Sequence, residues 1–156
     1  MIKPLDEFVK RFRTRIVLDE TLLVEKRNGY YILNENLRRY VSSDFLYAGT
    51  YLGKTRHKEF VPSFHLLNMI AETGANKVYV DERTEWLFIC GRDVFKRGVK
   101  KTTGTARRGD YTLVMNLRGE CLGLGQFPVD STEEVEGVAV QNLLDLGDFL
   151  RRERQH

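Results

Sequence analysis

The sequence predicts an α+β protein of two small domains: an N-terminal α/β domain with an antiparallel sheet over residues 1–75, and a small C-terminal β-barrel over residues 76–156. Helical and hairpin patterns alternate in the first half. After Asn76, short β-rich runs recur about every ten residues, as they do in small barrels. A half of about 75 residues buries only roughly 60% of its unfolded surface, so we expect the two halves to pack against each other.

The first half opens with a helix that is expected over residues 4–16. Pro4 stands in its first turn, where a missing backbone N–H costs little. The apolar residues that recur at the spacing of one helix face are Leu5, Phe8, Val9, Phe12 and Ile16. This spacing predicts that these side chains point together into the core.

Strands and one more helix follow in the first half. The β-rich runs on either side of Asn28-Gly29 predict a hairpin over residues 21–35, because this dipeptide readily adopts the positive φ of a tight turn. We expect a further strand over residues 38–53. A helix is predicted over residues 63–74, ending at Gly74 in a left-handed cap.

The second half contains one predicted helix among several short strands. Residues 83–91 form an apolar helical pattern that Gly91 is placed to cap, and Arg118-Gly119 marks a hairpin tip. The expected strands lie at residues 77–81, 93–101, 111–116, 120–127 and 137–143.

Composition favours a soluble intracellular protein. No apolar run approaches the roughly 20 residues that span a bilayer. The first residues lack the apolar stretch of a signal peptide, and two cysteines are too few for a disulfide framework. We therefore expect a cytoplasmic location, or a nucleolar one if the source is a eukaryote.

The charges are segregated along the chain, although the net charge is only +3. Residues 92–118 hold eight basic residues against two acids, a local balance of +6. Residues 119–150 hold seven acids and no lysine or arginine. Such segregation predicts one face of the protein that concentrates anions.

The basic residues are densest in the stretch VFKRGVKKTTGTARRGD, residues 94–110. Its glycines and threonines keep the segment narrow, so backbone N–H and hydroxyl donors can reach phosphate or ribose oxygens beside the cationic side chains. This pattern favours nucleic-acid binding. The alternative is an exposed strand edge whose lysines discourage aggregation.

Metal and nucleophilic sites are not predicted. Cys90 and Cys121 lie 31 residues apart, and His57 and His65 lie eight apart with a proline between them, so no close pair of ligands exists. No nucleophile motif or dinucleotide-binding glycine pattern is present. We expect no catalytic residue, no metal and no cofactor.

One motif imitates a nucleotide site. AGTYLGKT, residues 48–55, fits a loosened phosphate-loop pattern, which would make the chain a nucleotide-binding protein. A phosphate loop requires a helix directly after its lysine, whereas Tyr51 and Leu52 alternate like strand residues and Pro62 interrupts the required helix. This alternative is therefore disfavoured.

The second half resembles a PUA domain, the small RNA-binding pseudo-barrel named from pseudouridine synthases and archaeosine transglycosylases. The similarity is carried by KVYVD, WLFICGRDVFKRGV, GDYTLVMNLRGECLGLGQF and GVAVQNLLDLGDFLR, in this order. The most recognisable part is the glycine-capped helix followed by Asp93-Val94 and the strand through Gly98-Val99. The resemblance implies a PUA pseudo-β-barrel over residues 76–156.

The first half extends the resemblance to nearly the whole chain. YAGTYLGKTRHKEFVPSFHLLNMIA directly before KVYVD resembles the Nip family of large-ribosomal-subunit biogenesis factors, the seventh of that name. The basic end RRERQH is similar to the archaeal branch. The resemblance implies a non-catalytic factor that binds precursor rRNA and acts with ribosome assembly proteins in pre-rRNA processing. We expect a monomer whose N-terminal domain contributes protein contacts.

The resemblance also implies the RNA-binding residues, because PUA domains meet RNA with the capped helix, the following strand and the end of the domain. Together with the charge pattern, this predicts a site formed by Arg92, Lys96, Arg97, Lys100, Lys101, Arg107, Arg108, Arg151 and Arg152. We expect residues 102–110 to form a mobile loop, and Arg151 and Arg152 to act together with the strand around Lys100. The remaining alternative is an enzyme, or an accessory subunit of one, that modifies tRNA or rRNA.

Overall fold

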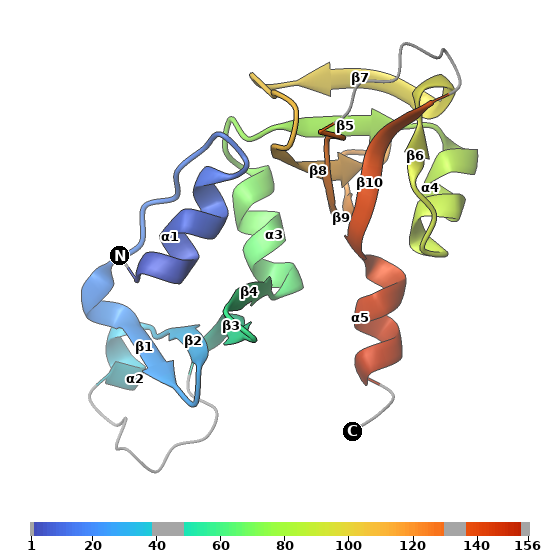
Figure 1. Cartoon of the computed structure of the whole chain (residues 1–156). Helices are drawn as coiled ribbons and strands as arrows, with labels where there is room; N and C mark the ends of the chain where they lie inside the picture. Colours follow the sequence, from blue (N-terminus) through green and yellow to red (C-terminus); the bar gives the residue numbers. More distant parts are fainter. Residues whose placement is uncertain (1, 39–48, 130–136, 154–156) are drawn as a thin grey trace.

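A computed structural model describes residues 2–38, 49–129 and 137–153 (Figure 1). The elements of the first half are α1 (Lys3–Lys10), a 3-10 turn (Glu20–Leu22), β1 (Leu23–Lys26), β2 (Gly29–Ile32), α2 (Glu35–Arg38), β3 (Thr50–Arg56), β4 (Glu59–Pro62) and α3 (Phe64–Ala71). Those of the second half are β5 (Lys77–Val80), α4 (Glu82–Ile89), β6 (Val94–Phe95), a 3-10 turn (Lys96–Gly98), β7 (Val99–Thr103), β8 (Tyr111–Met115), β9 (Cys121–Gln126), β10 (Val138–Asp145) and α5 (Leu146–Glu153).

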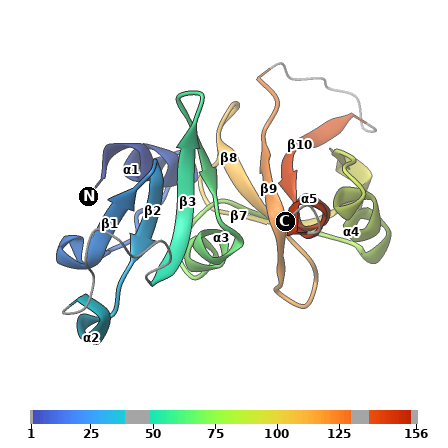
Figure 2. The same cartoon turned by 90° about the horizontal axis from the view of Figure 1, so that it is seen from below.

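The strands form two sheets. The first half contains a four-stranded antiparallel sheet in the order β1-β2-β3-β4, which Figure 2 shows beside α1 and α3. The second half contains a curled six-stranded sheet in the order β6-β10-β9-β8-β5-β7, in which β5 and β8 run parallel and the other paired strands antiparallel. The predicted α+β class, with an antiparallel N-terminal sheet and a PUA-type curled sheet, is confirmed.

The first helix is shorter than predicted, although all five side chains of its predicted inner face are buried. α1 ends at Lys10, and Arg13 adopts a positive φ of 58°. Hydrogen bonds to distant parts of the chain explain why the helix ends early. The carbonyls of Arg11 and Phe12, which a longer helix would use, accept hydrogen bonds instead from the backbone N–H groups of Tyr111 and Asn76, at 2.9 and 3.0 Å.

Two glycine assignments were wrong. The hairpin turn consists of Arg27-Asn28, with φ of 50° and 64°, and Lys26 pairs with Gly29, so the turn lies one residue earlier than predicted. α3 ends at Ala71 without a left-handed glycine, because the Thr73 hydroxyl donates to the Ile70 carbonyl at 2.6 Å and closes the helix end. The Gly91 cap, at φ 93°, is confirmed.

Some elements were not predicted at all. β4 and α5 are absent from the sequence-based expectation, and β3 begins only at Thr50. The expected strand over residues 38–53 falls in part on residues 39–48, which lie outside the described residues. The hairpin tip at Arg118-Gly119 is confirmed by the pairing of β8 with β9.

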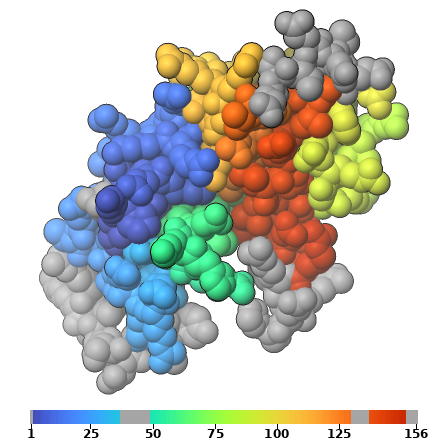
Figure 3. Space-filling view, in the orientation of Figure 1, coloured from blue at the N-terminus to red at the C-terminus, as the bar shows by residue number. Residues whose placement is uncertain are grey.

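One hydrophobic core serves both halves. Its buried side chains include Leu5, Phe8 and Phe12 from the first half, and Leu113 and Leu144 from the second. The Arg11 guanidinium also lies over the Tyr111 ring, 3.6 Å from its centroid. A separate cluster fills the barrel between its sheet and α4. The expectation that the halves pack together is met, and Figure 3 shows their surfaces adjoining.

None of the helices in the described ranges is both long enough and apolar enough to cross a membrane.

Candidate functional site

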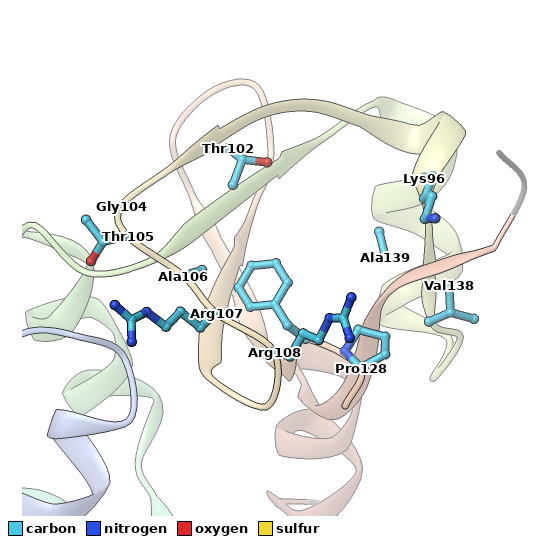
Figure 4. A pocket seen from close by; sticks show the side chains of 11 residues that line it. Lys96, Thr102, Gly104, Thr105, Ala106, Arg107, Arg108, Pro128, Val138 and Ala139 are labelled. Atoms are coloured by element: carbon cyan, nitrogen blue, oxygen red, sulfur yellow. The ribbon is translucent and has the colours of Figure 1, made fainter. Parts of the chain in front are cut away.

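A cavity of about 460 Å³ opens in the second half, beside the loop that follows β7 (Figure 4). Among the described residues, its lining combines three cationic residues with hydroxyls and an apolar wall, and includes no acidic one. The lining residues are Lys96, Thr102, Gly104, Thr105, Ala106, Arg107, Arg108, Phe127, Pro128, Val138 and Ala139.

The walls of the cavity come from segments far apart in the sequence. Lys96 follows β6, and its backbone N–H donates to the Gly137 carbonyl at 3.0 Å, which joins it to the start of β10. Figure 4 shows Lys96 and Ala139 on one side of the cavity and Arg108 directed toward Pro128. Arg107 points in the opposite direction, toward the N-terminal half.

The loop that carries both arginines is tied at its two ends. At one end the Thr105 backbone N–H donates to the side chain of Asn76 at 3.2 Å. At the other, the Asp110 carboxylate accepts from the Arg107 backbone N–H at 2.8 Å and from Arg13 at 2.7 and 3.1 Å. These bonds fix the backbone on both sides of Arg107 and Arg108. The expected mobility of residues 102–110 stays a prediction.

The electrostatics of Asp110 explain this anchor. Burial raises the pKa of its carboxyl group, but the hydrogen bonds from Arg13 and from the Arg107 N–H, with the charges of both arginines, outweigh burial. The pKa of Asp110 therefore lies below its ordinary value. The anchor needs an ionised carboxylate, and the fold favours that form.

The two lysines of β7 have different neighbours. Lys101 stands opposite Tyr79 on β5, with its Nζ 5.4 Å from the centroid of the Tyr79 ring. Lys100 lies close enough to Asp81, at the start of α4, to contribute to lowering the pKa of that carboxyl group. The larger cause of that lowering is the pair of hydrogen bonds that Asp81 accepts from Thr84. Each lysine therefore has its own partner, Tyr79 for Lys101 and Asp81 for Lys100.

The remaining predicted cations lie around the other end of α4 or stand exposed. Arg151 donates to Asp148 at 2.7 Å and lies 3.7 Å from the buried Asp145, whose pKa is raised by burial. Arg92 is exposed directly after α4, and Arg97 is exposed before β7. Arg152 belongs to α5, but its side chain lies outside the described residues.

The geometry separates two groups that the sequence joined. Lys100 lies near the first residues of α4, whereas Arg151 lies near Cys90 at its last turn. An eight-residue helix is ~12 Å long at ~1.5 Å per residue. The structure instead brings Lys96, Arg107 and Arg108 to one cavity.

The apolar wall of this cavity was missed by sequence reasoning. Phe127 and Pro128 follow β9, while Val138 and Ala139 begin β10. The sequence marks these residues as apolar but does not show that they face the cationic loop. A cationic rim above an apolar wall suits a ligand that has both a phosphate and a flat apolar ring.

Three other kinds of site can be compared with the described residues: a metal centre, a reactive thiol and a phosphate loop. No group of three or more His, Cys, Asp or Glu side chains that could hold a metal is found there. Burial raises the pKa of Cys121 to about 11, so its thiol is protonated at neutral pH. Lys54 of the phosphate-loop motif lies in β3, and β4 rather than a helix follows it.

Comparison with known proteins identifies the second half. The family model of the UPF0113 PUA domain matches residues 76–154, which is half of the chain. The chain belongs to the UPF0113 PUA domain family. PUA domains bind RNA, and the cavity with its cationic loop lies within the PUA domain of this chain.

A relative and two solved structures extend the similarity. A UPF0113 protein of Archaeoglobus fulgidus is 30% identical over 114 residues, which cover 70% of this chain and 64% of the relative. A conserved PUA domain protein from Thermoplasma acidophilum is 23% identical, with a TM-score of 0.61 and coverage of 97% of this chain and 92% of that one. A PUA domain structure from Aeropyrum pernix K1 is 19% identical, with a TM-score of 0.62 and coverage of 100% and 89%. These structures share the fold over both halves.

Proposed function

We propose that this protein is a non-catalytic RNA-binding factor of large-ribosomal-subunit assembly. The observation that carries RNA binding is the cavity in the PUA domain, where Lys96, Arg107 and Arg108 meet an apolar wall. The resemblance to the Nip family supports the ribosomal role and the absence of enzymatic activity. Precursor rRNA is then the ligand, and assembly proteins are partners of the N-terminal half.

The mechanism follows from the residues at the cavity. Lys96 and Arg108 on its rim neutralise phosphates and release their counterions, which makes affinity depend on salt. The apolar wall accepts the face of an unpaired base, and Thr102 and Thr105 offer hydroxyl groups to ribose or phosphate oxygens. RNA shape and unpaired bases, rather than a base code, set the selectivity.

The test is the salt dependence of binding to a short labelled oligouridylate, followed by fluorescence anisotropy. If four to six phosphates are engaged, the logarithm of affinity falls against the logarithm of salt concentration with a slope of about −3 to −4. The variant Arg107→Gln/Arg108→Gln should bind more weakly, with a slope smaller in magnitude by about 0.7, the share of the Arg108 contact.

The control removes two charges elsewhere. Lys3→Gln/Arg15→Gln changes two exposed cations of the first half that do not line the cavity. It should bind as the wild type does. A salt-independent affinity, or equal losses in both variants, would place RNA binding elsewhere or exclude it.

The ribosomal role needs a cellular test. Tagged protein should co-sediment with precursors of the large subunit, and in-cell crosslinking should recover rRNA fragments. Recovery of mature tRNA together with a modification activity on unmodified RNA would instead support the enzyme or accessory-subunit alternative.

A further inference from the structure

Within the described residues, the N-terminal sheet has one face on which neither α1 nor α3 packs. α1 packs near β4 and α3 near β3 on the other face, where Tyr30 and Leu52 are buried in the shared core. The uncovered face carries Tyr31 of β2 and, from β3, Tyr51, Lys54 and Arg56. Tyr51 and Lys54 belong to the phosphate-loop motif, and Arg56 directly follows it. The disfavoured nucleotide hypothesis gives these residues no role.

A β-bulge places these residues on the same face. In a regular strand Tyr51 and Lys54, three residues apart, would point to opposite faces. The register of β2 with β3 shifts between Tyr30, which pairs with Gly53, and Tyr31, which pairs with Tyr51. Leu52 is the extra residue, and its side chain is fully buried. The bulge thus turns both Tyr51 and Lys54 outward.

Gly53 makes this bulge possible. Its φ is 145°, and a Cβ at this position would lie 2.5 Å from the Val61 carbonyl oxygen. The glycine of the motif is therefore required by close strand packing. Lys54 after it becomes a surface cation of the sheet and not a ligand of a phosphate loop.

The two tyrosines form an accessible aromatic surface. Their ring centroids lie 5.4 Å apart with planes inclined by 46°, and Tyr51 is 38% exposed. The Tyr31 ring extends over Gly29, since a Cβ on Gly29 would lie 3.2 Å from its Cε2 atom. Gly29 pairs with Lys54 across the strands, so the aromatic surface continues directly to a cation.

Further cations surround the tyrosines. The turns of the two hairpins lie side by side, because the Thr55 backbone N–H donates to the Asn28 carbonyl at 2.9 Å. The two hairpins carry five positive charges near their turns and two negative ones. The cations are Lys26, Arg27, Lys54, Arg56 and Lys58, and the acids are Glu25 and Glu59. Within the described residues, no ion pair engages Lys54, Arg56 or Lys58.

We propose that this sheet face is a second RNA-binding surface, which takes a single-stranded segment: bases stack on Tyr31 and Tyr51, and adjoining phosphates contact Lys54 and Arg56. Exposed aromatic rings beside cations are the combination that single-stranded nucleic acid requires, because every base offers an aromatic face and every nucleotide a negative charge. The proposal goes beyond the function assigned to the PUA domain, because it gives the N-terminal half its own RNA contact.

The experiment compares matched variants of the full chain. Tyr31→Leu/Tyr51→Leu removes both rings but keeps apolar side chains, whereas Tyr31→Phe/Tyr51→Phe keeps the rings. Lys54→Gln/Arg56→Gln removes two charges, with Lys3→Gln/Arg15→Gln as the charge-matched control. Binding to an oligouridylate is followed by anisotropy over a range of salt, folding is checked by circular dichroism, and crosslinks of a 4-thiouridine oligonucleotide are mapped by mass spectrometry.

The leucine pair should weaken binding on the order of tenfold, and the phenylalanine pair should bind like the wild type. Lys54→Gln/Arg56→Gln should reduce the magnitude of the salt slope by about 1 to 1.5, and crosslinks should map to Tyr31 or Tyr51. Crosslinks confined to residues 76–153, with an unchanged leucine pair, would overturn the proposal.

The PUA variant separates this proposal from the proposed function. If Arg107→Gln/Arg108→Gln weakens binding while the leucine pair does not, the PUA domain binds RNA and the sheet face does not. The reverse pattern supports the sheet face and contradicts the PUA site. A leucine pair that loses a protein partner but keeps its RNA affinity also overturns the proposal.

Discussion

Arg13 and Asp110 show how single residues connect the two halves to the candidate site. Arg13 lies just after α1, in a left-handed conformation, and its guanidinium donates two hydrogen bonds to Asp110. Asp110 in turn accepts from the backbone of Arg107 at the cavity. The Arg107 end of the cationic loop is therefore positioned by a side chain 94 residues earlier in the chain.

This contact predicts a pH dependence of stability. The folded-state pKa of Asp110 is lowered, so its contribution is present above the ordinary carboxyl pKa of about 4 and is lost as pH falls through the lowered value. Asp110→Asn should lower the melting temperature by a few degrees at pH 7. This deficit relative to wild type should shrink below about pH 4 in thermal melts followed by circular dichroism. A deficit that stays constant into acid would show that the carboxylate charge is not what matters.

At the scale of elements, the sequence predicted the helices and strands whose apolar spacing follows from burial in the core. The helix face of residues 5–16 was predicted because its apolar spacing reflects the core, even though the helix itself ends early. The bulge at Leu52 and Gly53 was not predictable, since it depends on the register with β2 and on the carbonyl of Val61.

The helix α5 was missed for a physical reason. Gly147 in its first turn lowers helix propensity, yet the fold requires it, because a Cβ there would lie 2.3 Å from the Ile89 carbonyl oxygen at the end of α4. Asp145 also caps α5 by accepting from the Asp148 backbone N–H at 3.0 Å. That capping pattern is present in the sequence and could have found the helix.

The candidate site was predictable in its charges but not in its shape. The cluster of basic residues along the sequence included Lys96, Arg107 and Arg108, because residues that are close in sequence stay close in the folded chain. It could not show that Val138, 30 residues beyond Arg108, forms the opposing wall. Nor could it show that α4 separates Lys100 from Arg151. Such juxtapositions arise from strand pairing across the curled sheet.

At the scale of the whole molecule, the shared core makes the two halves interdependent. Leu113, Leu124 and Leu144 of the PUA domain are buried in the same cluster as Leu5 and Phe8. Each buried leucine contributes about 1.5–3 kcal/mol, and a domain's net stability is only about 5–15 kcal/mol. Loss of the first half therefore removes a large part of the stability of the second.

This predicts the behaviour of a truncated chain. Residues 76–156 alone should melt at a lower temperature and less cooperatively than the full chain, and should bind a hydrophobic dye through the uncovered side chains. Thermal melts and dye fluorescence of both proteins in the same buffer provide the comparison. An isolated second half that melts as cooperatively and at the same temperature would mean that the interface adds no stability.

The shared core also has a consequence for synthesis. α1 leaves the ribosome long before Leu144, which lies 139 residues later but is buried in the same core as Leu5. A chain is made at ~5–20 residues per second, so the apolar face of α1 waits for about 7 to 28 s before Leu144 emerges. During translation this face is a natural target for chaperones, and the shared core is completed only after Leu144 has emerged.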